Sequence, residues 1–348
     1  MENSYVIDNG GYYCRIGRSG EDDCEYKCRS IVSLDDHQVV VGSDHGNDDN
    51  YVSPMERGIV LDWERMETVW NHAYQAVSCN PSDSAVLLTE TILNPKSNRE
   101  RMVEVLFESF QVPYTQFVWE GLLNIYASGR GSALSIMCGD GTCHALPINE
   151  GYLMTRGLYR SDFGGSDITL YLMKLLKESG KLNFNKKIVN NIKEKLCNCK
   201  GDSSDKIYDL PGGGTVEIGD ESVRAANLLF DPSPICGDEL SIPDMILKSA
   251  LSAEIDQRYL FVNNTVLGGG SSLMAGFDAK LQEQMKEKWA IAAPTLKSRV
   301  ITPPDREKSV WIGGSILTSL STFHQKWISH KDFSDFGPSI VYRKLSAS

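Results

Sequence analysis

Apolar residues recur along this chain in two alternating patterns, short strand-like runs and longer helical stripes. The first run, Tyr5-Val6-Ile7, stops at Asp8-Asn9-Gly10-Gly11, and a strand pattern resumes from Tyr12 to Ile16. Asn-Gly is a strong hairpin signal because it accepts the positive φ angles of a tight turn. The chain is therefore predicted to begin with a strand–turn–strand unit that has an aspartate at its turn.

A second unit of the same design follows about 130 residues later. Ala133 to Met137 forms an apolar run, Cys138-Gly139-Asp140-Gly141 makes a turn, and Thr142 to Ile148 returns as a strand. Both units place an aspartate in or beside a glycine turn. This repetition predicts two lobes built on a related plan.

Between and after these units, apolar residues at three- and four-residue steps predict amphipathic helices. The predicted helices are Trp63 to Val77, Asn98 to Phe110, Ser166 to Leu176 (capped by Ser166 or Asp167), Lys186 to Cys197, Asp278 to Trp289 and Val310 to Phe323. Lys200 to Asp205 is predicted as a loop. Alternating strands and helices indicate an α/β architecture.

One further segment combines an apolar run with a glycine turn. Tyr259 to Leu267 is predicted to be a strand, and it opens into Gly268-Gly269-Gly270-Ser271-Ser272 ahead of a helix. Strand, glycine turn and helix together let backbone N–H groups approach a phosphate or a sugar. The segment is therefore a candidate nucleotide contact.

Composition and charge argue against several classes of protein. The chain has 46 acidic and 35 basic residues and a formal net charge of −11, which argues against a dedicated nucleic-acid surface. Neither a secretory leader nor a run of about 18 uncharged apolar residues is recognisable, so we expect no membrane span. The nine cysteines show no zinc-type spacing and are expected to be reduced thiols.

Several stretches, in order along nearly the whole chain, resemble the actin family. They are Leu88 to Glu100, Tyr126 to Arg130, Ile192 to Cys197, Asn264 to Gly270, Val310 to Phe323 and Gly337 to Lys344. The resemblance implies the α/β fold of the actin, sugar-kinase and Hsp70 superfamily, with two duplicated lobes around a nucleotide cleft. It implies a first lobe at residues 1–127, a second lobe at 128–309, and a C-terminal segment, 310–348, that packs back onto the first.

The resemblance also implies site residues. ATP or ADP would be bound with Mg²⁺ or Ca²⁺, and Asp8 and Asp140 would hold the metal through water. Lys193 and Glu194 match the adenosine side, where a carboxylate accepts hydrogen bonds from ribose hydroxyls. The full set of implied nucleotide-binding residues is Asp8, Asn9, Gly10, Gly11, Arg15, Gly139, Asp140, Gly141, Lys193, Glu194, Gly269 and Gly270.

The two turns depart from the family pattern. The first has Gly11, Tyr12 and Arg15 where the family usually has Ser, Gly and Lys, which removes a phosphate hydrogen bond and crowds the turn. At the second, Met137 stands where the family places an aspartate that helps to arrange the metal's water shell. A thioether is a poor ligand for Mg²⁺, which prefers oxygen donors.

The residues implied to position the attacking water are changed in part. Glu120 stands where the family has a glutamine, and it either adds negative charge beside the γ-phosphate or acts as a base. His144 is either a second water-positioning residue or a hydrogen-bonded histidine of a strand. Because positioning and charge stabilisation dominate phosphoryl transfer, we expect an intact adenosine pocket with slow or absent turnover.

Assembly surfaces differ as well. By this resemblance the first lobe is shortened near residues 30–55: the DNase-binding loop of actin is deleted, and the short acidic stretch His45 to Asn50 replaces it. A short acidic loop supplies no apolar plug, which disfavours filament formation. The opposite end matches the groove where actin-binding helices dock, through Tyr126, Ile316, Leu320 and Thr322.

The favoured hypothesis is a nucleotide-binding actin relative that serves as a subunit or end-cap of a cytoskeletal or chromatin-associated assembly. Its expected partners are other actin-family subunits or actin-binding proteins, without direct nucleic-acid or membrane contact. The expected location is the cytoplasm and cytoskeleton, with the nucleus as the alternative. Two other hypotheses stay open: a divergent polymerising actin with active ATPase, and a small-molecule kinase of the same superfamily.

Overall fold

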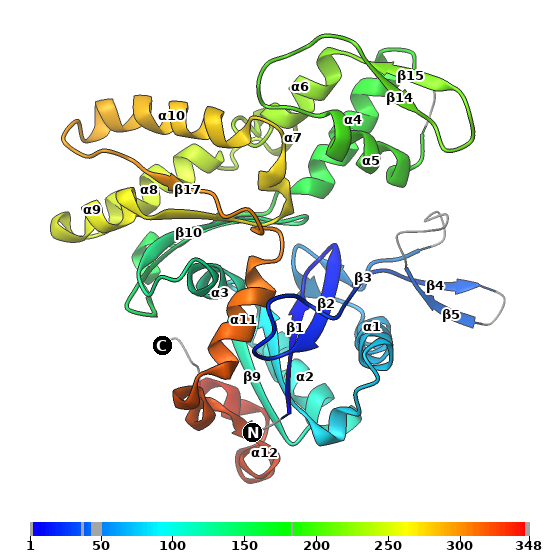
Figure 1. Ribbon diagram of the computed structural model, residues 1–348, viewed down its shortest axis with the longest axis vertical. Helices are drawn as coiled ribbons and strands as arrows, with labels where there is room; N and C mark the ends of the chain where they lie inside the picture. Colours follow the sequence, from blue (N-terminus) through cyan, green and yellow to red (C-terminus); the bar gives the residue numbers. More distant parts are fainter. Residues whose placement is uncertain (1–2, 36–37, 43–50, 182–183, 345–348) are drawn as a thin grey trace.

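Two mixed β-sheets, one above the other in Figure 1, organise the chain. The computed structural model describes residues 3–35, 38–42, 51–181 and 184–344. The first sheet has the strand order β18-β9-β8-β1-β2-β3. Its strands are β1 (Ser4–Asn9), β2 (Tyr13–Arg18), β3 (Tyr26–Arg29), β8 (Ala85–Glu90), β9 (Tyr114–Trp119) and β18 (Ile328–Ser329).

The second sheet has the order β12-β11-β10-β16-β17, with β13 also paired to β11. Its strands are β10 (Ala133–Cys138), β11 (Cys143–Asn149), β12 (Tyr152–Leu153), β13 (Tyr159–Ser161), β16 (Thr265–Gly268) and β17 (Val300–Ile301). Like β1, which is antiparallel to β2 and parallel to β8, β10 is antiparallel to β11 and parallel to β16. The two predicted strand–turn–strand units therefore stand at equivalent places in two similar sheets.

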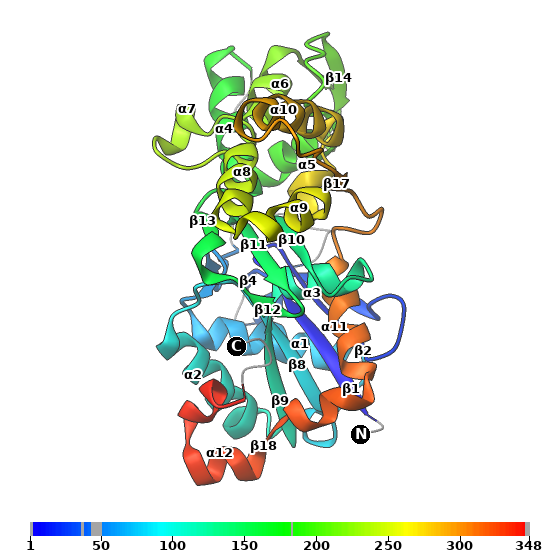
Figure 2. The ribbon, with the colours of Figure 1, turned by 90° about the vertical axis from the view of Figure 1, so that its left-hand side faces the viewer.

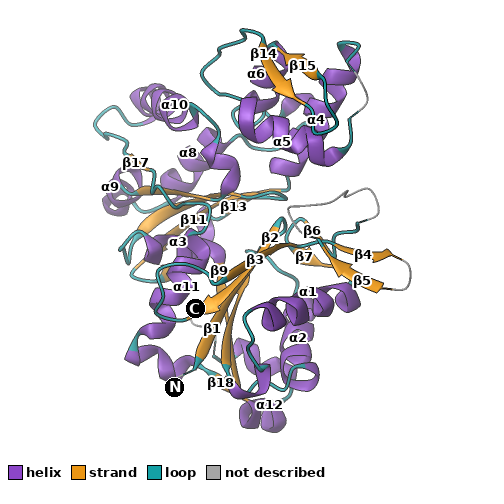
Figure 3. Cartoon of the chain, turned by 45° about the vertical axis from the view of Figure 1, so that its right-hand side comes forward, coloured by secondary structure: helices purple, strands orange, loops and turns teal. Residues whose placement is uncertain are grey.

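Short hairpins extend from these sheets. They are β4 (Val32–Asp35) with β5 (Gln38–Val41), β6 (Met55–Glu56) with β7 (Ile59–Val60), and β14 (Lys206–Asp209) with β15 (Thr215–Ile218). Figure 3 shows β4 and β5 as an arm that projects away from the rest of the lower lobe. The acidic stretch His45 to Asn50, expected to replace a filament loop, lies outside the described residues.

Helices cover both sheets. Around the first sheet lie α1 (Trp63–Ala76), α2 (Lys96–Glu104), α3 (Glu120–Ala127), α11 (Ser309–Ser319) and α12 (His330–Phe336). Around the second lie α4 (Gly165–Glu178), α5 (Lys186–Leu196), α6 (Asp220–Asn227), α7 (Ser233–Cys236), α8 (Ile242–Ser252), α9 (Ile255–Asn263) and α10 (Phe277–Ala292). Short 3₁₀ turns connect several of them: Pro81–Asp83, Thr155–Gly157, Gly270–Leu273, Ser321–Lys326 and Pro338–Tyr342.

The predicted helices near residues 63, 186 and 278 are confirmed within a few residues. The predicted helix from Asn98 to Phe110 is α2 followed by a π-helical turn, Val105–Ser109. The predicted cap of α4 is confirmed in part: Gly164 is the N-cap residue, and Asp167 caps the helix from the third helical position by accepting a hydrogen bond from the Gly164 N–H at 2.8 Å. The helix predicted from Val310 to Phe323 is α11, which ends earlier, at Ser319.

The predicted strand from Tyr259 to Leu267 was wrong over most of its length. Residues up to Asn263 belong to α9, and only Thr265–Gly268 is a strand, β16. A short apolar run fits a buried helix as well as a strand, and here Phe261 and Val262 pack into the core from a helix. The glycine turn still follows a strand, as predicted.

A cluster of buried residues, including Val6, Leu123, Met137, Val266 and Trp311, joins the two sheets through α3 and α11. These helices pack against each other, as Figures 1 and 2 show. The backbones approach so closely that a Cβ at Gly313 would lie 1.9 Å from the Leu123 carbonyl oxygen. Trp311 donates from Nε1 to the Val6 carbonyl at 3.1 Å, which fixes α11 against β1. The base of the cleft between the sheets is therefore rigid.

Candidate functional site

A cavity of about 420 Å³ lies between the turns of the β1–β2 and β10–β11 hairpins. It brings together most of the predicted site residues, from both lobes. Those that line it are Asp8, Gly10, Gly11, Arg15, Glu120, Met137, Gly139, Asp140, Gly141, Lys193, Glu194, Gly269 and Gly270. Asn9 and His144 were also predicted to belong to the site and do not line it.

The first turn owes its shape to close backbone packing. A Cβ at Gly10 would lie 2.7 Å from the Tyr13 carbonyl oxygen, so only glycine fits there. The positive φ angles predicted for Asn9-Gly10 are absent, because residues 10–13 link the strands in a wider turn. The buried Asn9 faces α1, where its Oδ1 accepts from Trp70 Nε1 at 3.0 Å. Asn9 thus ties the first turn to helix α1.

Asp8 and Arg15 form a buried ion pair at the floor of the cavity. Arg15 Nη1 lies 3.0 Å from Asp8 Oδ2, and the two side chains are 11% and 5% exposed. Burial raises the pKa of Asp8, and the positive charge of Arg15 opposes that shift. Thr89 adds a longer hydrogen bond to the other carboxylate oxygen, at 3.4 Å. The charge of Asp8 is therefore largely balanced from within the first lobe.

The second turn is held by the start of α4. Backbone N–H groups of Gly165 and Ser166 donate to the carbonyl oxygens of Gly139 and Asp140, at 3.0 and 2.8 Å. Burial raises the pKa of Asp140, while the nearby positive charge of Lys193 opposes the shift. Asp8 from the first hairpin and Asp140 from the second therefore line the same cavity.

Helix α5 and the glycine turn form another wall. Lys193 donates from Nζ to the Gly165 carbonyl at 2.9 Å, and burial lowers the pKa of its ammonium. Gly269 has φ 85°, and a Cβ there would lie 2.3 Å from the Cys138 carbonyl oxygen. Gly270 has open space around it, so a ligand can approach its backbone. Residue 269 must therefore be glycine because of its positive φ and close packing, whereas glycine at residue 270 leaves room for a ligand.

The three residues expected near the reacting phosphate lie in different surroundings. Met137 is buried and lines the cavity beside Gly268, where a Cβ would lie 2.5 Å from the methionine sulfur. Glu120 also lines the cavity, and burial, with a smaller contribution from the charge of Asp8, raises its pKa to about 8. Its carboxyl group is consequently protonated at neutral pH.

His144 does not reach the cavity. It sits directly opposite Met137 in the β10–β11 register, is 1% exposed, and neither ring nitrogen has a hydrogen-bond partner among the described residues. Burial lowers its pKa to about 3, so the imidazole is neutral. No described residue pairs with the imidazole, and both a hydrogen-bonded strand histidine and a role in positioning water stay predictions.

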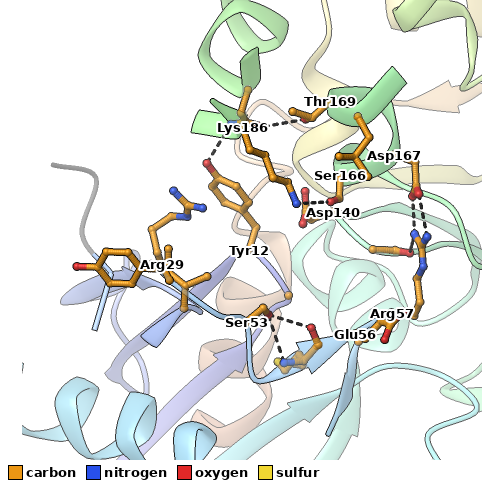
Figure 4. A pocket seen from close by; sticks show the side chains of 18 of the residues that line it. Tyr12, Arg29, Ser53, Glu56, Arg57, Asp140, Ser166, Asp167, Thr169 and Lys186 are labelled. Atoms are coloured by element: carbon orange, nitrogen blue, oxygen red, sulfur yellow. Dashed lines mark hydrogen bonds and ion pairs between the residues drawn. The ribbon is translucent and has the colours of Figure 1, made fainter. Parts of the chain in front are cut away.

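Two contacts across the cleft were not predicted. Tyr12, on the first turn, accepts a hydrogen bond from Asn190 Nδ2 of α5 at 2.9 Å. Arg57, between β6 and β7, makes a two-pronged ion pair with Asp167 of α4, in which Nη2 lies 2.8 Å from Oδ1. Figure 4 shows Tyr12 and the Arg57–Asp167 pair around a neighbouring cavity of about 370 Å³, which Asn190 also lines. In the sequence, Asn190 stands four residues before Glu194 in a predicted helix, and this spacing could have predicted that the two side chains meet on one helix face.

The predicted partner groove lies on the α3 and α11 side of the molecule. Ile316 and Leu320 are 42% and 48% exposed, Thr322 is exposed, and Tyr126 is half-buried. Exposed apolar side chains at the end of α11 are compatible with docking, and their role stays a prediction.

The cavity residues suit a nucleotide better than a directly ligated metal. Among the described residues no three His, Cys, Asp or Glu side chains are arranged to hold an ion. Mg²⁺ usually keeps several waters and takes only one or two carboxylates together with phosphate oxygens. Asp8 and Asp140 fit that water-mediated role, and the open space at Gly11 and Gly270 fits the close approach of phosphate groups.

Two similar sheets, with a cavity between their hairpin turns and a glycine turn beside it, define a two-lobed α/β protein. The family model for actin matches residues 1–185 and 178–346. The chain therefore belongs to the actin family. None of the helices in the described part of the chain has the length and apolar character needed to cross a membrane.

Proposed function

We propose that this chain binds ATP or ADP, with Mg²⁺ or Ca²⁺, as a structural ligand and hydrolyses it slowly or not at all. The observation that carries the proposal is Met137, whose side chain lines the cavity where the family places a carboxylate. Gly11 on the first turn and Gly270 after β16 line the cavity with open space around them, so a phosphate or sugar can approach their backbone. These features support nucleotide binding, while Met137 offers no oxygen ligand for catalysis.

The bound nucleotide would meet groups from both lobes. Asp8 and Asp140 would orient the waters of a divalent ion, which neutralises phosphate charge when it is bound. Lys193 would contribute positive charge, and Glu194 would accept hydrogen bonds from ribose hydroxyls. Arg15 already neutralises Asp8, which lowers the negative charge that the phosphates meet.

Weak turnover is expected because of two residues that line the cavity, Met137 and Glu120. A methionine thioether neither holds nor polarises the waters around Mg²⁺. A protonated Glu120 at neutral pH is a poor general base, because its proton is already in place. Two of the residues that the resemblance links to the attacking water are therefore changed in this chain, while His144 is kept.

We also propose an assembly role. The chain would act as a subunit or end-cap in a cytoskeletal or chromatin-associated complex, in the cytoplasm or nucleus. Its partners would be actin-family subunits or proteins that dock beside Ile316 and Leu320. The shortened segment near residues 30–55 supports capping rather than filament growth.

Turnover of Mg-ATP tests this proposal. Phosphate release would be compared between the unmodified protein, Met137→Asp and the uncharged control Met137→Asn. We expect negligible release by the unmodified protein and at least about tenfold more from Met137→Asp than from Met137→Asn. Release by the unmodified protein that rises with its concentration would show polymerisation-coupled hydrolysis and overturn the proposal.

A further inference from the structure

A chain of three polar side chains crosses the cleft from the first turn to the proposed ribose carboxylate. Asn190 Nδ2 donates one hydrogen bond to the Tyr12 hydroxyl at 2.9 Å and another to Glu194 Oε1 at 2.7 Å. The Thr169 hydroxyl shares its one proton between Asn190 Oδ1, at 3.2 Å, and the Gly165 carbonyl, at 3.0 Å. Because both N–H groups of Asn190 are donated to acceptors, its amide is held in one orientation.

The Tyr12 ring is itself restrained. The Arg29 guanidinium carbon lies 4.0 Å from the centre of the Tyr12 ring, and the Tyr13 ring packs edge-on at 4.7 Å. Figure 4 shows Tyr12 reaching across the cavity with its hydroxyl toward the helices of the upper lobe. Cation–π and edge-to-face contacts of this kind hold a ring in place. Tyr12 therefore offers a fixed hydrogen-bond acceptor to Asn190.

Glu194 needs such an anchor. Its residue is exposed, and an exposed carboxylate otherwise samples several rotamers. A side chain that is already held in its bound orientation loses less entropy when a ligand binds. Asn190, buried at 5% exposure, supplies this restraint, and Tyr12 fixes Asn190 from the opposite lobe.

We propose that Tyr12 is a positioning residue for nucleoside recognition, acting through Asn190 on Glu194. This inference rests on the proposed nucleotide site and adds to it. When the lobes are closed, Tyr12 completes the network and Glu194 is set to accept the ribose hydroxyls. When the lobes part, the Tyr12–Asn190 hydrogen bond breaks and the carboxylate is released. Closure of the cleft and recognition of ribose are thus one event.

Binding of ADP, 2′-deoxy-ADP and 3′-deoxy-ADP tests the inference, with dissociation rates measured by displacement of a fluorescent ADP. Tyr12→Phe removes the hydroxyl and keeps the ring. We expect ADP to dissociate about fivefold faster, as for the loss of one ordinary hydrogen bond, and the preference for ADP over the weaker-binding deoxy analogue to fall by a similar factor. Tyr26→Phe is the matched control, since that hydroxyl lies 3.0 Å from His72 Nε2, outside the cavity.

A double-mutant cycle separates positioning from general loosening. Asn190→Ala should give the same loss of ribose preference, and Tyr12→Phe should add nothing to it, because both act through one contact. The inference is overturned if Tyr12→Phe keeps both the dissociation rate and the ribose preference within twofold, or if the two variants add fully. If neither ADP nor ATP binds to the unmodified protein, the proposed function fails and the inference with it.

Discussion

The guanidinium of Arg15 lies 3.0 Å from the carboxylate of Asp8, and both side chains are almost completely buried. Arg15→Gln should lower the free energy of unfolding by about 3 kcal/mol, because it leaves Asp8 without its counter-charge in a low-dielectric site. Denaturant unfolding measures the loss. Arg224→Gln is the control: its pair with Asp220 is exposed, so the cost should stay below about 0.5 kcal/mol. Equal losses for the two variants would show that the Asp8–Arg15 pair is not structurally important.

The raised pKa of Glu120 should give stability a measurable pH dependence. Its carboxyl keeps its proton up to about pH 8 in the folded protein but loses it near pH 4.5 when unfolded. The folded state therefore binds more protons between these values, and its stability falls as the pH rises from about 5 to 8. Converting the whole pKa shift at about 1.4 kcal/mol per unit would overestimate the loss of stability, because Glu120 is partly open to the cavity. We expect the free energy of unfolding to fall by about 2 kcal/mol over this pH range.

Glu120→Gln should remove that part of the pH dependence. The comparison is denaturant unfolding of the variant and the unmodified protein between pH 5 and pH 8. Glu178→Gln serves as a control at an exposed site whose carboxylate lies 3.9 Å from Lys174, and it should leave the slope unchanged. A Glu120→Gln variant with the same slope as the unmodified protein would mean that Glu120 titrates normally.

Arg57 and Asp167 should be energetically coupled across the cleft. Arg57 also donates to the Gly141 carbonyl at 3.0 Å, so one side chain connects the β6–β7 hairpin to both α4 and the second turn. A double-mutant cycle with Arg57→Gln and Asp167→Asn should give a coupling energy of about 1–2 kcal/mol. A coupling energy near zero would show that the lobes are held together by other contacts.

The glycine turn offers a matched pair of substitutions. Gly269→Ala forces a side chain into a positive φ and against the Cys138 carbonyl, and should cost more than about 2 kcal/mol of stability. Gly270→Ala meets open space and should be close to neutral in thermal unfolding. If both variants unfold alike, the backbone at residue 269 is more adaptable than its packing indicates.

Much of this architecture could be predicted from the sequence. The two hairpins with their aspartates and the helices α1, α5 and α10 appear where apolar periodicity placed them. The strand predicted from Tyr259 failed because apolar content alone does not separate a buried helix from a strand. The sequence predicted a tight Asn-Gly turn, whereas the first turn is wider. Its shape depends on the close approach of Gly10 to the Tyr13 backbone, which the Asn-Gly pair does not reveal.

The sequence pointed to most residues that line the candidate site but not to the contacts between them. The resemblance to actin pointed to residues such as Asp8, Asp140, Lys193 and Glu194, which the structure gathers around one cavity. It did not reveal the Tyr12–Asn190 and Arg57–Asp167 contacts, because these depend on how the lobes are placed in three dimensions. The division of the chain into lobes at residue 127 stays a prediction.

The most direct test of the central claim is the nucleotide content of the purified protein. The protein would be denatured after removal of free nucleotide, and the released compounds identified and counted by chromatography. The proposed function predicts about one adenine nucleotide per chain, retained through purification. A protein that carries none and takes up neither ADP nor ATP on addition would contradict it, and the cleft would then be a structural remnant of the family fold.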